Sequence, residues 1–323
     1  FLVHGGQAAL LAGLGIAGFK SGFFDGRAKS KGTALQNTRF AAMGTYLDIS
    51  LEGKADPEAI RQAIAAVSNV ERAMSFFDAD SELSRLNRTR AGVACEISSA
   101  LLAVLEAGRA AHKTTGGAFD PTVAPLVATW GFNHSAVTEL PSTQKVRAAC
   151  ELVGLDKMTF DGSLVAFARD GMSVDLGGIA KGHGADRAAA TLTEQGLSGI
   201  INAGGDIRVA GQRADGRQWH IGIRDPVHTD RVFATVDLGP DRAVATSGTY
   251  EQFLDIKGRR VSHIIDPRSG EPGSTVVSAT VVAETAMMAD ALATACIVMS
   301  PSEGLSVLAH IRGVEGLLVW RTD

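Results

Sequence analysis

The stretch SVDLGGIAKGHG, residues 173–184, is the segment around which the rest of the chain is organised. An apolar, strand-like run carries one carboxylate, Asp175, and then breaks into Gly177 and Gly178. A helical pattern follows, with apolar residues recurring close to every 3.6 positions, at Ile179, Ala185, Ala189 and Leu192. Backbone N–H groups at a turn of this kind can point at a phosphate. The alternative is a tight strand-to-helix turn without a ligand.

Length and composition indicate a globular protein and exclude some classes of partner. At 323 residues the chain is long for one hydrophobic core, so two lobes or one large mixed domain are both open. The formal charge of −4 and the lack of a Lys/Arg cluster argue against nucleic-acid binding. Cys95, Cys150 and Cys296 have neither CxxC nor zinc-site spacing. Whether Cys95 and Cys150 pair is left open.

Residues 1–37 differ in composition from the rest of the chain. The run LLAGLGIAGF, residues 10–19, is too short to span a bilayer and resembles the apolar core of an export signal. The other interpretation is an ordinary N-terminal helix. The polar stretch that follows, residues 25–37, is expected to be a flexible segment before the folded domain. We therefore expect one folded domain over residues 38–323.

Strand and helix patterns are mixed along that domain. Helices are expected after Asp56 and Ser98, each of which can cap a helix N-terminus. Further helices are expected over residues 140–154 and 285–299, and strands over 158–161, 164–169, 199–203, 207–210, 219–224, 231–238 and 276–283. Phe76 and Phe77 are adjacent, so one of them must point away from the core that the other joins. That ring is either a wall for a planar ligand or ordinary packing.

The apolar helix expected over residues 285–299 contains a single acid, Asp290. Thr294 lies four residues later and therefore on the same helix face. Burying a carboxylate among apolar residues is unfavourable by several kcal/mol unless a cation or donor meets it. A carboxylate and a hydroxyl are hard oxygen ligands that suit Mg²⁺ or Ca²⁺ better than zinc. Pairing of Asp290 with an arginine, or exposure to solvent, is the alternative.

Seven motifs in this order resemble the ApbE family of FAD:protein FMN transferases. They are AMGT (42–45), SELSRLN (81–87), FDPTVAPLVATWGF (119–132), VDLGGIAKG (174–182), TSGTYEQF (246–253), SHIIDPRSG (262–270) and ADALATA (289–295). The resemblance runs from about Phe40 to the end of the chain. It implies an α+β (mixed α/β), two-lobed fold with FAD in a cleft between the lobes.

The resemblance also implies a function. It implies an enzyme that uses Mg²⁺ to move FMN from FAD onto a threonine hydroxyl of a target protein, releasing AMP. It further implies a periplasmic location, an acceptor among membrane redox subunits, and at most peripheral membrane contact. Two alternatives stay open: an FAD pyrophosphatase that releases FMN and AMP, and a flavin-binding protein without chemistry of its own.

The site residues follow from the motifs that they occupy. The resemblance implies that the metal is held by Asp290, Thr294 and the backbone carbonyl of Gly178. It places at the FAD the residues Met43, Phe77, Ala118, Phe119, Asp120, Asp175, Lys181, His263 and Ile264. Family members commonly have Tyr where Phe77 stands, so ring stacking is retained but a hydroxyl contact is not.

Two catalytic roles are hypotheses from residue type and motif position. His263 is expected to accept the proton of the attacking threonine hydroxyl, with Asp175 as the second candidate. A single histidine at the end of a strand is otherwise a structural residue. Lys181 would add a positive charge beside the pyrophosphate.

Overall fold

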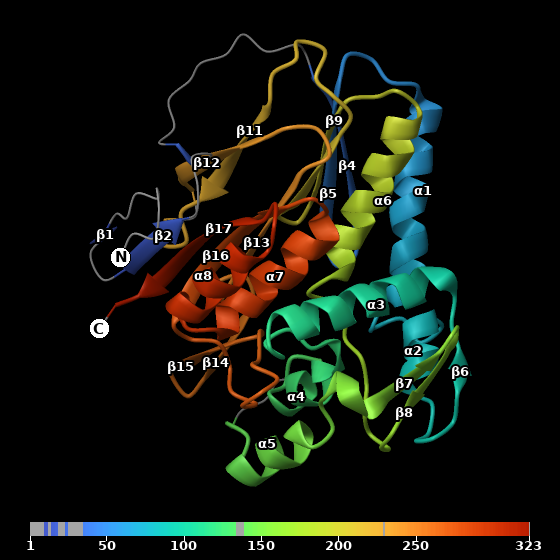
Figure 1. Cartoon of the computed structure of the whole chain (residues 1–323), viewed down its shortest axis with the longest axis vertical. Helices are drawn as coiled ribbons and strands as arrows, with labels where there is room; N and C mark the ends of the chain where they lie inside the picture. Colours follow the sequence, from blue (N-terminus) through green and yellow to red (C-terminus); the bar gives the residue numbers. More distant parts are fainter. Residues whose placement is uncertain are drawn as a thin grey trace.

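The computed structural model describes residues 35–133, 139–228 and 230–322 with their side chains (Figure 1). It also places the short strands β1 (Leu10–Leu11), β2 (Leu14–Gly18) and β3 (Phe23–Phe24). Helices and strands are mixed along the chain, which confirms the expected α+β class. In the part of the chain described, no helix combines the length and the apolar character needed to cross a bilayer.

A nine-stranded sheet is the centre of the fold, and all its neighbouring strands run antiparallel. In spatial order its strands are β1, β2, β17 (Glu315–Arg321), β16 (Val276–Ala283), β13 (Ala243–Gly248), β10 (Asp206–Ala210), β9 (Gly199–Ala203), β5 (Thr45–Glu52) and β4 (Leu35–Ala42). The domain boundary expected after residue 37 falls inside β4.

Both faces of this sheet are covered at its centre. Every residue of β16 is buried, and successive side chains enter different cores: Val281 packs with α7 (Ala286–Val298) and α8 (Pro301–His310), whereas Val282 packs with the sheet of β11 (Trp219–Arg224) and β12 (Val232–Leu238). The run of β-branched residues in β16 follows from this two-sided burial. Helix α7 has apolar residues on all sides because it is buried between other elements.

Two further long helices, α1 (Pro57–Met74) and α6 (Ala180–Glu194), pack together over β5 and β9. Asp56 caps α1 as expected, since its side chain accepts a hydrogen bond from the Glu58 N–H. Figure 1 shows α6 between α1 and α7, so the helix that follows the two glycines is surrounded by packed elements.

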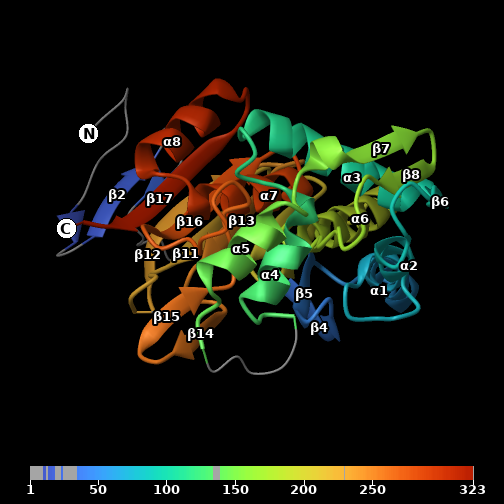
Figure 2. The same cartoon turned by 90° about the horizontal axis from the view of Figure 1, so that it is seen from below.

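A second lobe lies below the end of these helices (Figures 1 and 2). It contains α2 (Glu82–Asn87), α3 (Ser99–Thr114), α4 (Ala124–Thr129), α5 (Thr143–Cys150) and the small sheet of β6 (Cys95–Glu96), β7 (Met158–Asp161) and β8 (Leu164–Phe167). One hydrophobic core joins the two lobes, because it includes residues of α1, α3, β8 and α7 as well as Leu176 and Ile179. The β14 (Phe253–Ile256) and β15 (Arg259–Ser262) hairpin leads to His263.

Three expectations differ from the structure. Residues 172–176 are not a strand: the Asn87 side chain, instead of a neighbouring strand, bonds both the N–H and the C=O of Val174, each at 2.8 Å. The N-terminal helix alternative is wrong for Leu14–Gly18, which pairs with β17 as β2. The helix expected over 140–154 is shorter, because Ser142 caps it and it ends at Cys150. Cys95 and Cys150 are both free thiols.

Candidate active site

The start of α6 meets α7 because Gly182 has no side chain. A Cβ at this position would lie 2.2 Å from the backbone oxygen of Ala286, which no real side chain tolerates. One turn further along α6, the Asp186 carboxylate accepts hydrogen bonds from the N–H groups of Ala286 and Met287 at 2.8 and 2.9 Å. These contacts fix where the N-terminus of α7 lies along α6, and therefore place Asp290 beside the glycine turn.

Asp290 is only 2% exposed and faces α6, not solvent. Its partner is a lysine, not the arginine considered as an alternative: Lys181 Nζ lies 3.4 and 3.3 Å from Oδ1 and Oδ2 of Asp290. The backbone N–H of Gly182 also points at Oδ2, at 3.3 Å. The acid expected to be buried in an apolar helix is therefore met by a cation and a backbone donor.

A second carboxylate, Asp206, approaches the same ammonium. Lys181 Nζ is 3.0 Å from Asp206 Oδ2 and 3.3 Å from the Gly177 carbonyl oxygen. Burial raises the pKa of Asp206 well above its usual value, and the charge of Asp290 raises it further. Burial by itself would lower the pKa of Lys181, but the two carboxylates outweigh it and raise that pKa. Lys181 is therefore a cation between two buried acids.

Gly178 and Thr294 lie against each other beside this cluster. A Cβ at Gly178 would lie 3.0 Å from Thr294 Oγ1 and 3.4 Å from the ring of Phe119. The hydroxyl of Ser247, in β13, lies 3.4 Å from Thr294 Oγ1. The structure thus brings together the three predicted metal ligands, Gly178, Asp290 and Thr294.

Asp175 lies at the turn itself. Its backbone N–H donates to the Pro121 carbonyl at 2.7 Å, and its Oδ1 accepts from the Gly177 N–H at 2.8 Å. Burial raises the pKa of Asp175, although the Gly177 hydrogen bond opposes that shift. The carboxylate stabilises the glycine turn, and a role as proton acceptor stays a prediction.

His263 follows the β14–β15 hairpin and is half-buried. Its Nδ1 lies 2.9 Å from the backbone oxygen of Gln252. Burial lowers the pKa of His263, and the positive charge of Lys181 lowers it further, while the Gln252 carbonyl opposes the shift. The ring is therefore neutral at pH 7. Ile264 is buried next to it and packs in the core of α7 and β16.

Met43 and Phe77 occupy different surroundings. Met43 has a positive φ of 53°, its N–H donates to Glu71 Oε1 at 2.7 Å, and its sulfur lies against Gly184 of α6.

Phe77 is 78% exposed, whereas Phe76 packs against the core that joins the lobes. The two rings meet edge to face with centroids 5.6 Å apart. The expectation that one ring points away from the core is confirmed, and flavin stacking on Phe77 stays a prediction.

Ala118, Phe119 and Asp120 are buried next to the glycine turn. Asp120 Oδ1 accepts from the N–H and hydroxyl of Thr122 at 2.8 and 2.6 Å, and Oδ2 accepts from the Leu155 N–H at 3.2 Å. The His112 ring adds a contact of 3.2 Å to Oδ2. These partners occupy the carboxylate, so an FAD contact of this run would use backbone atoms or the Phe119 ring.

Sequence reasoning missed two acids of this region, Asp206 and Glu251. Asp206 follows the glycine pair 204–205, a signal of the same kind as the one at 177–178. Glu251 belongs to the TSGTYEQF motif; although its side chain is exposed, the surrounding protein desolvates the carboxyl and raises its pKa to about 7, while the charge of Lys181 opposes the shift and that of Asp290 adds to it. Neither acid lies in an apolar helix, so neither stands out from its sequence neighbours as Asp290 does.

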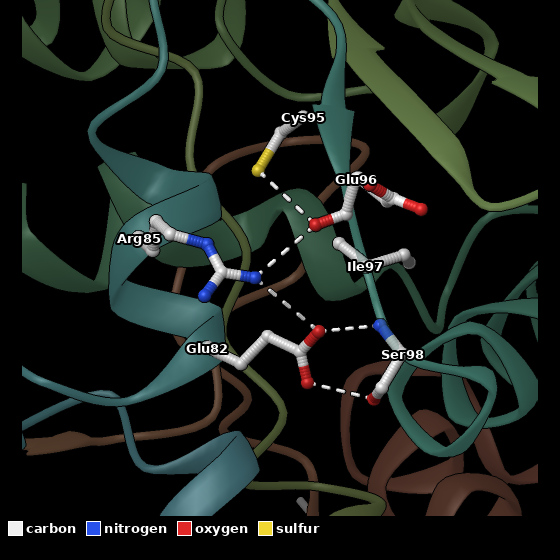
Figure 3. A pocket seen from close by; sticks show the side chains of 6 residues that line it. All are labelled: Glu82, Arg85, Cys95, Glu96, Ile97 and Ser98. Carbon is white, nitrogen blue, oxygen red and sulfur yellow. Dashed lines mark hydrogen bonds and ion pairs between the residues drawn. The ribbon is translucent and has the colours of Figure 1, made fainter.

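A separate open pocket of about 500 Å³ lies in the second lobe, between α2 and β6 (Figure 3). Two acids line it, Glu82 and Glu96, and the Glu82 carboxylate is bonded by the N–H and, at 2.7 Å, by the hydroxyl of Ser98, and lies 3.5 Å from Arg85. Arg85 also donates to the Glu96 carbonyl at 3.1 Å. Because its polar groups already bond one another, this pocket is not the candidate site.

A metal site in this structure has to be sought among hydroxyl and backbone oxygens as well as among His, Cys, Asp and Glu side chains. Among the described residues, no group of three or more His, Cys, Asp or Glu side chains is arranged to hold one. The set around Asp290 instead has one carboxylate, the Thr294 hydroxyl and the backbone at Gly178. Such an all-oxygen set fits Mg²⁺, which retains several waters and takes only one or two carboxylates.

Comparison with known proteins identifies the family of this chain. The model of the ApbE family matches residues 43–318. A Vibrio cholerae protein named FAD:protein FMN transferase is 35% identical over 288 residues, covering 87% of this chain and 86% of the relative. The crystal structure of the ApbE protein of Thermotoga maritima superposes with a TM-score of 0.82 at 31% identity, covering 90% of this chain and 97% of that one. For the V. cholerae flavin transferase ApbE the TM-score is 0.81 at 33% identity, over 90% and 95% of the two chains. The chain therefore belongs to the ApbE family.

Proposed function

We propose that this protein is an enzyme that transfers FMN from FAD to a threonine hydroxyl of a target protein and releases AMP. The observation that carries the proposal is the meeting of Asp290 with the glycine turn, where Lys181 Nζ and the Gly182 N–H both contact the buried carboxylate. A pyrophosphate needs its negative charge neutralised, and a carboxylate held in this position beside Thr294 and Gly178 would retain the divalent cation that does so. The names of the relatives support flavin transfer as the reaction.

The residues present fit one Mg²⁺ as a cofactor, held by Asp290, Thr294 and the carbonyl of Gly178. The ion, when bound, supplies positive charge that stabilises the pyrophosphate and the departing AMP. Ser247 contacts Thr294 Oγ1 at 3.4 Å and so helps to orient this hydroxyl. The buried Asp290 is fixed by Gly182 and Lys181, which limits its freedom to turn away from the site.

His263 is the proposed proton acceptor. A backbone carbonyl can only accept, so the 2.9 Å contact with the Gln252 oxygen places the ring proton on Nδ1. Nε2 then carries the free lone pair. Because burial lowers the pKa of His263, the ring is neutral near pH 7 and can take a proton.

The reaction balances with these groups. The acceptor threonine oxygen attacks the phosphorus of the FMN half of FAD, its proton passes to Nε2 of His263, and a new P–O bond forms. The bridging P–O bond of the pyrophosphate breaks and AMP leaves with its electron pair. Lys181 offers a positive charge near the phosphates, and Asp175 holds the glycine turn through Gly177.

A periplasmic location and a membrane redox subunit as acceptor stay predictions of the family resemblance. The half-buried position of His263 supports the approach of a protein segment, because the residue is not enclosed by the core. No nucleic-acid partner is expected from the net charge of −4.

The test is incubation of the full chain with FAD, Mg²⁺ and a candidate acceptor, followed by mass spectrometry of the denatured acceptor. A mass gain equal to FMN minus water supports the proposal. Release of FMN and AMP without attachment would instead identify an FAD pyrophosphatase, and recovery of intact FAD would identify a flavin-binding protein. Asp290→Asn should abolish the metal-dependent reaction, whereas full activity of that variant in excess EDTA would contradict the metal assignment.

A further inference from the structure

We infer that Asp206 is a positioning residue for the metal site, because it can hold the Lys181 ammonium when a divalent cation takes Asp290. The inference rests on the proposed Mg²⁺ site and adds a residue that is not one of its ligands. Asp206 is 2% exposed, and its Oδ2 lies 3.0 Å from Lys181 Nζ.

The ammonium and a metal ion both require Asp290. Lys181 Nζ lies almost equally far from the two oxygens of Asp290, at 3.4 and 3.3 Å, so it faces the whole carboxylate. A divalent cation bound to Asp290 therefore has a built-in competitor of like charge. Two positive charges a few ångströms apart repel strongly in a buried site. The site works only if the ammonium has another place to bind.

Asp206 and the Gly177 carbonyl provide that place. Lys181 Nζ is closer to Asp206 than to either oxygen of Asp290, and it is 3.3 Å from the Gly177 oxygen. These two acceptors still hold the ammonium when the oxygens of Asp290 bind the cation.

The position of Asp206 is fixed independently of Lys181. It begins β10 directly after the turn of Gly204 and Gly205, which have φ angles of 63° and 109°. The N–H of Gly205 donates to the Asn202 side-chain oxygen at 2.8 Å, and β10 pairs with both β9 and β13. The carboxylate is therefore held by the rigid sheet while the long lysine side chain adapts to it.

Replacement of Asp206 should thus weaken metal binding through Lys181. In Asp206→Asn the ammonium loses its nearest charged partner, and Asp290 becomes the carboxylate that holds it. We expect the affinity for Mn²⁺ to fall about tenfold or more, the range seen when groups that support metal ligands are lost. In the double variant Lys181→Met/Asp206→Asn the competitor is also gone, and we expect the affinity to return to within about threefold of wild type, because Asp290 is then free for the metal.

The experiment measures Mn²⁺ binding to the full chain with FAD, from the loss of the free-ion EPR signal, with protein-free FAD as the blank. Thermal unfolding of each variant is recorded in parallel. Asp215→Asn is the matched control, because Asp215 also neutralises basic side chains, Arg213 and Arg217, but in an exposed loop between β10 and β11. Its Mn²⁺ affinity should equal that of wild type.

Each outcome decides the matter. Weaker binding by Asp206→Asn together with recovery in the double variant supports the inference, since a purely structural loss would not be repaired by a second substitution. Unchanged binding by Asp206→Asn, or a double variant as weak as the single one, overturns it. Failure of wild type itself to bind Mn²⁺ would overturn the proposed metal site and this inference with it, whereas normal binding without flavin transfer would contradict only the proposed reaction.

Discussion

Gly178 lies against Thr294 so closely that a Cβ at residue 178 would be 3.0 Å from both Oγ1 and Cγ2 of the threonine. The glycine turn and α7 thus meet without room for a methyl group. Gly178→Ala should displace Thr294 and raise the Mg²⁺ concentration for half-maximal flavin transfer by about tenfold or more. Titration of Mg²⁺ in the transfer assay measures this. An unchanged Mg²⁺ requirement would show that Thr294 and the Gly178 carbonyl do not act together.

Gly182 allows α6 to approach α7, and its replacement should be more disruptive. In Gly182→Ala the new methyl would meet the backbone of Ala286 at 2.2 Å, so the helices must separate. We expect a loss of about 1–3 kcal/mol in the free energy of unfolding, as for other overpacked sites. Urea denaturation measures it. Gly239→Ala is the control, because its methyl would meet only Gln218, at 3.5 Å. Equal stability of the two variants would refute the close approach.

His263 determines the expected dependence of transfer on pH. Its pKa is lowered from the ordinary value of 6.5, and a base must be unprotonated to work. The rate kcat/KM should therefore stay level as pH falls to 6.5 and decline only at lower pH, where the ring binds a proton. His263→Ala should lower transfer by ~10²-fold or more and remove this acidic limb. An acidic limb that persists in the variant would assign the titration to another group.

Phe77 provides a test of flavin stacking that is separate from stability. Because the ring is 78% exposed, Phe77→Ala should leave the thermal midpoint nearly unchanged. If the ring stacks on FAD, the variant should raise the KM for FAD by roughly tenfold, in line with the loss of one stacking partner. Tyr46→Ala, at a ring that is 62% exposed, is the control and should keep the wild-type KM. Identical KM values for both variants would exclude Phe77 from the flavin site.

Local sequence signals predicted the longest helices and part of the strands. Asp56 and Ser98 cap their helices through side-chain hydrogen bonds to Glu58 and Leu101, as their types predict. The spacing of Asp290 and Thr294 placed both on one helix face, and the apolar surroundings of Asp290 indicated a buried partner. These inferences succeed because caps, turns and helix faces depend on residues only a few positions apart.

The identity of that partner could not be predicted in the same way. The sequence alone left an arginine, a metal and solvent open for Asp290, and only the packing of α6 on α7 brings Lys181 to within 3.3 Å of it. The inclusion of Asp206 likewise depends on β10 pairing with β13, the strand next to β16. Contacts between residues far apart in sequence follow from how sheets and helices pack as a whole.

The sequence by itself therefore determined the four longest helices, α1, α3, α6 and α7, together with seven of the strands, the glycine turn and the chemical types of the site residues. Tertiary structure decided that Asn87, and not a neighbouring strand, bonds Val174, that Asp120 is occupied by its own lobe, and that one ammonium lies between Asp206 and Asp290. The physical reason is that a local motif fixes backbone geometry over a few residues, whereas the partner of a buried charge is whichever group the packed core brings within reach.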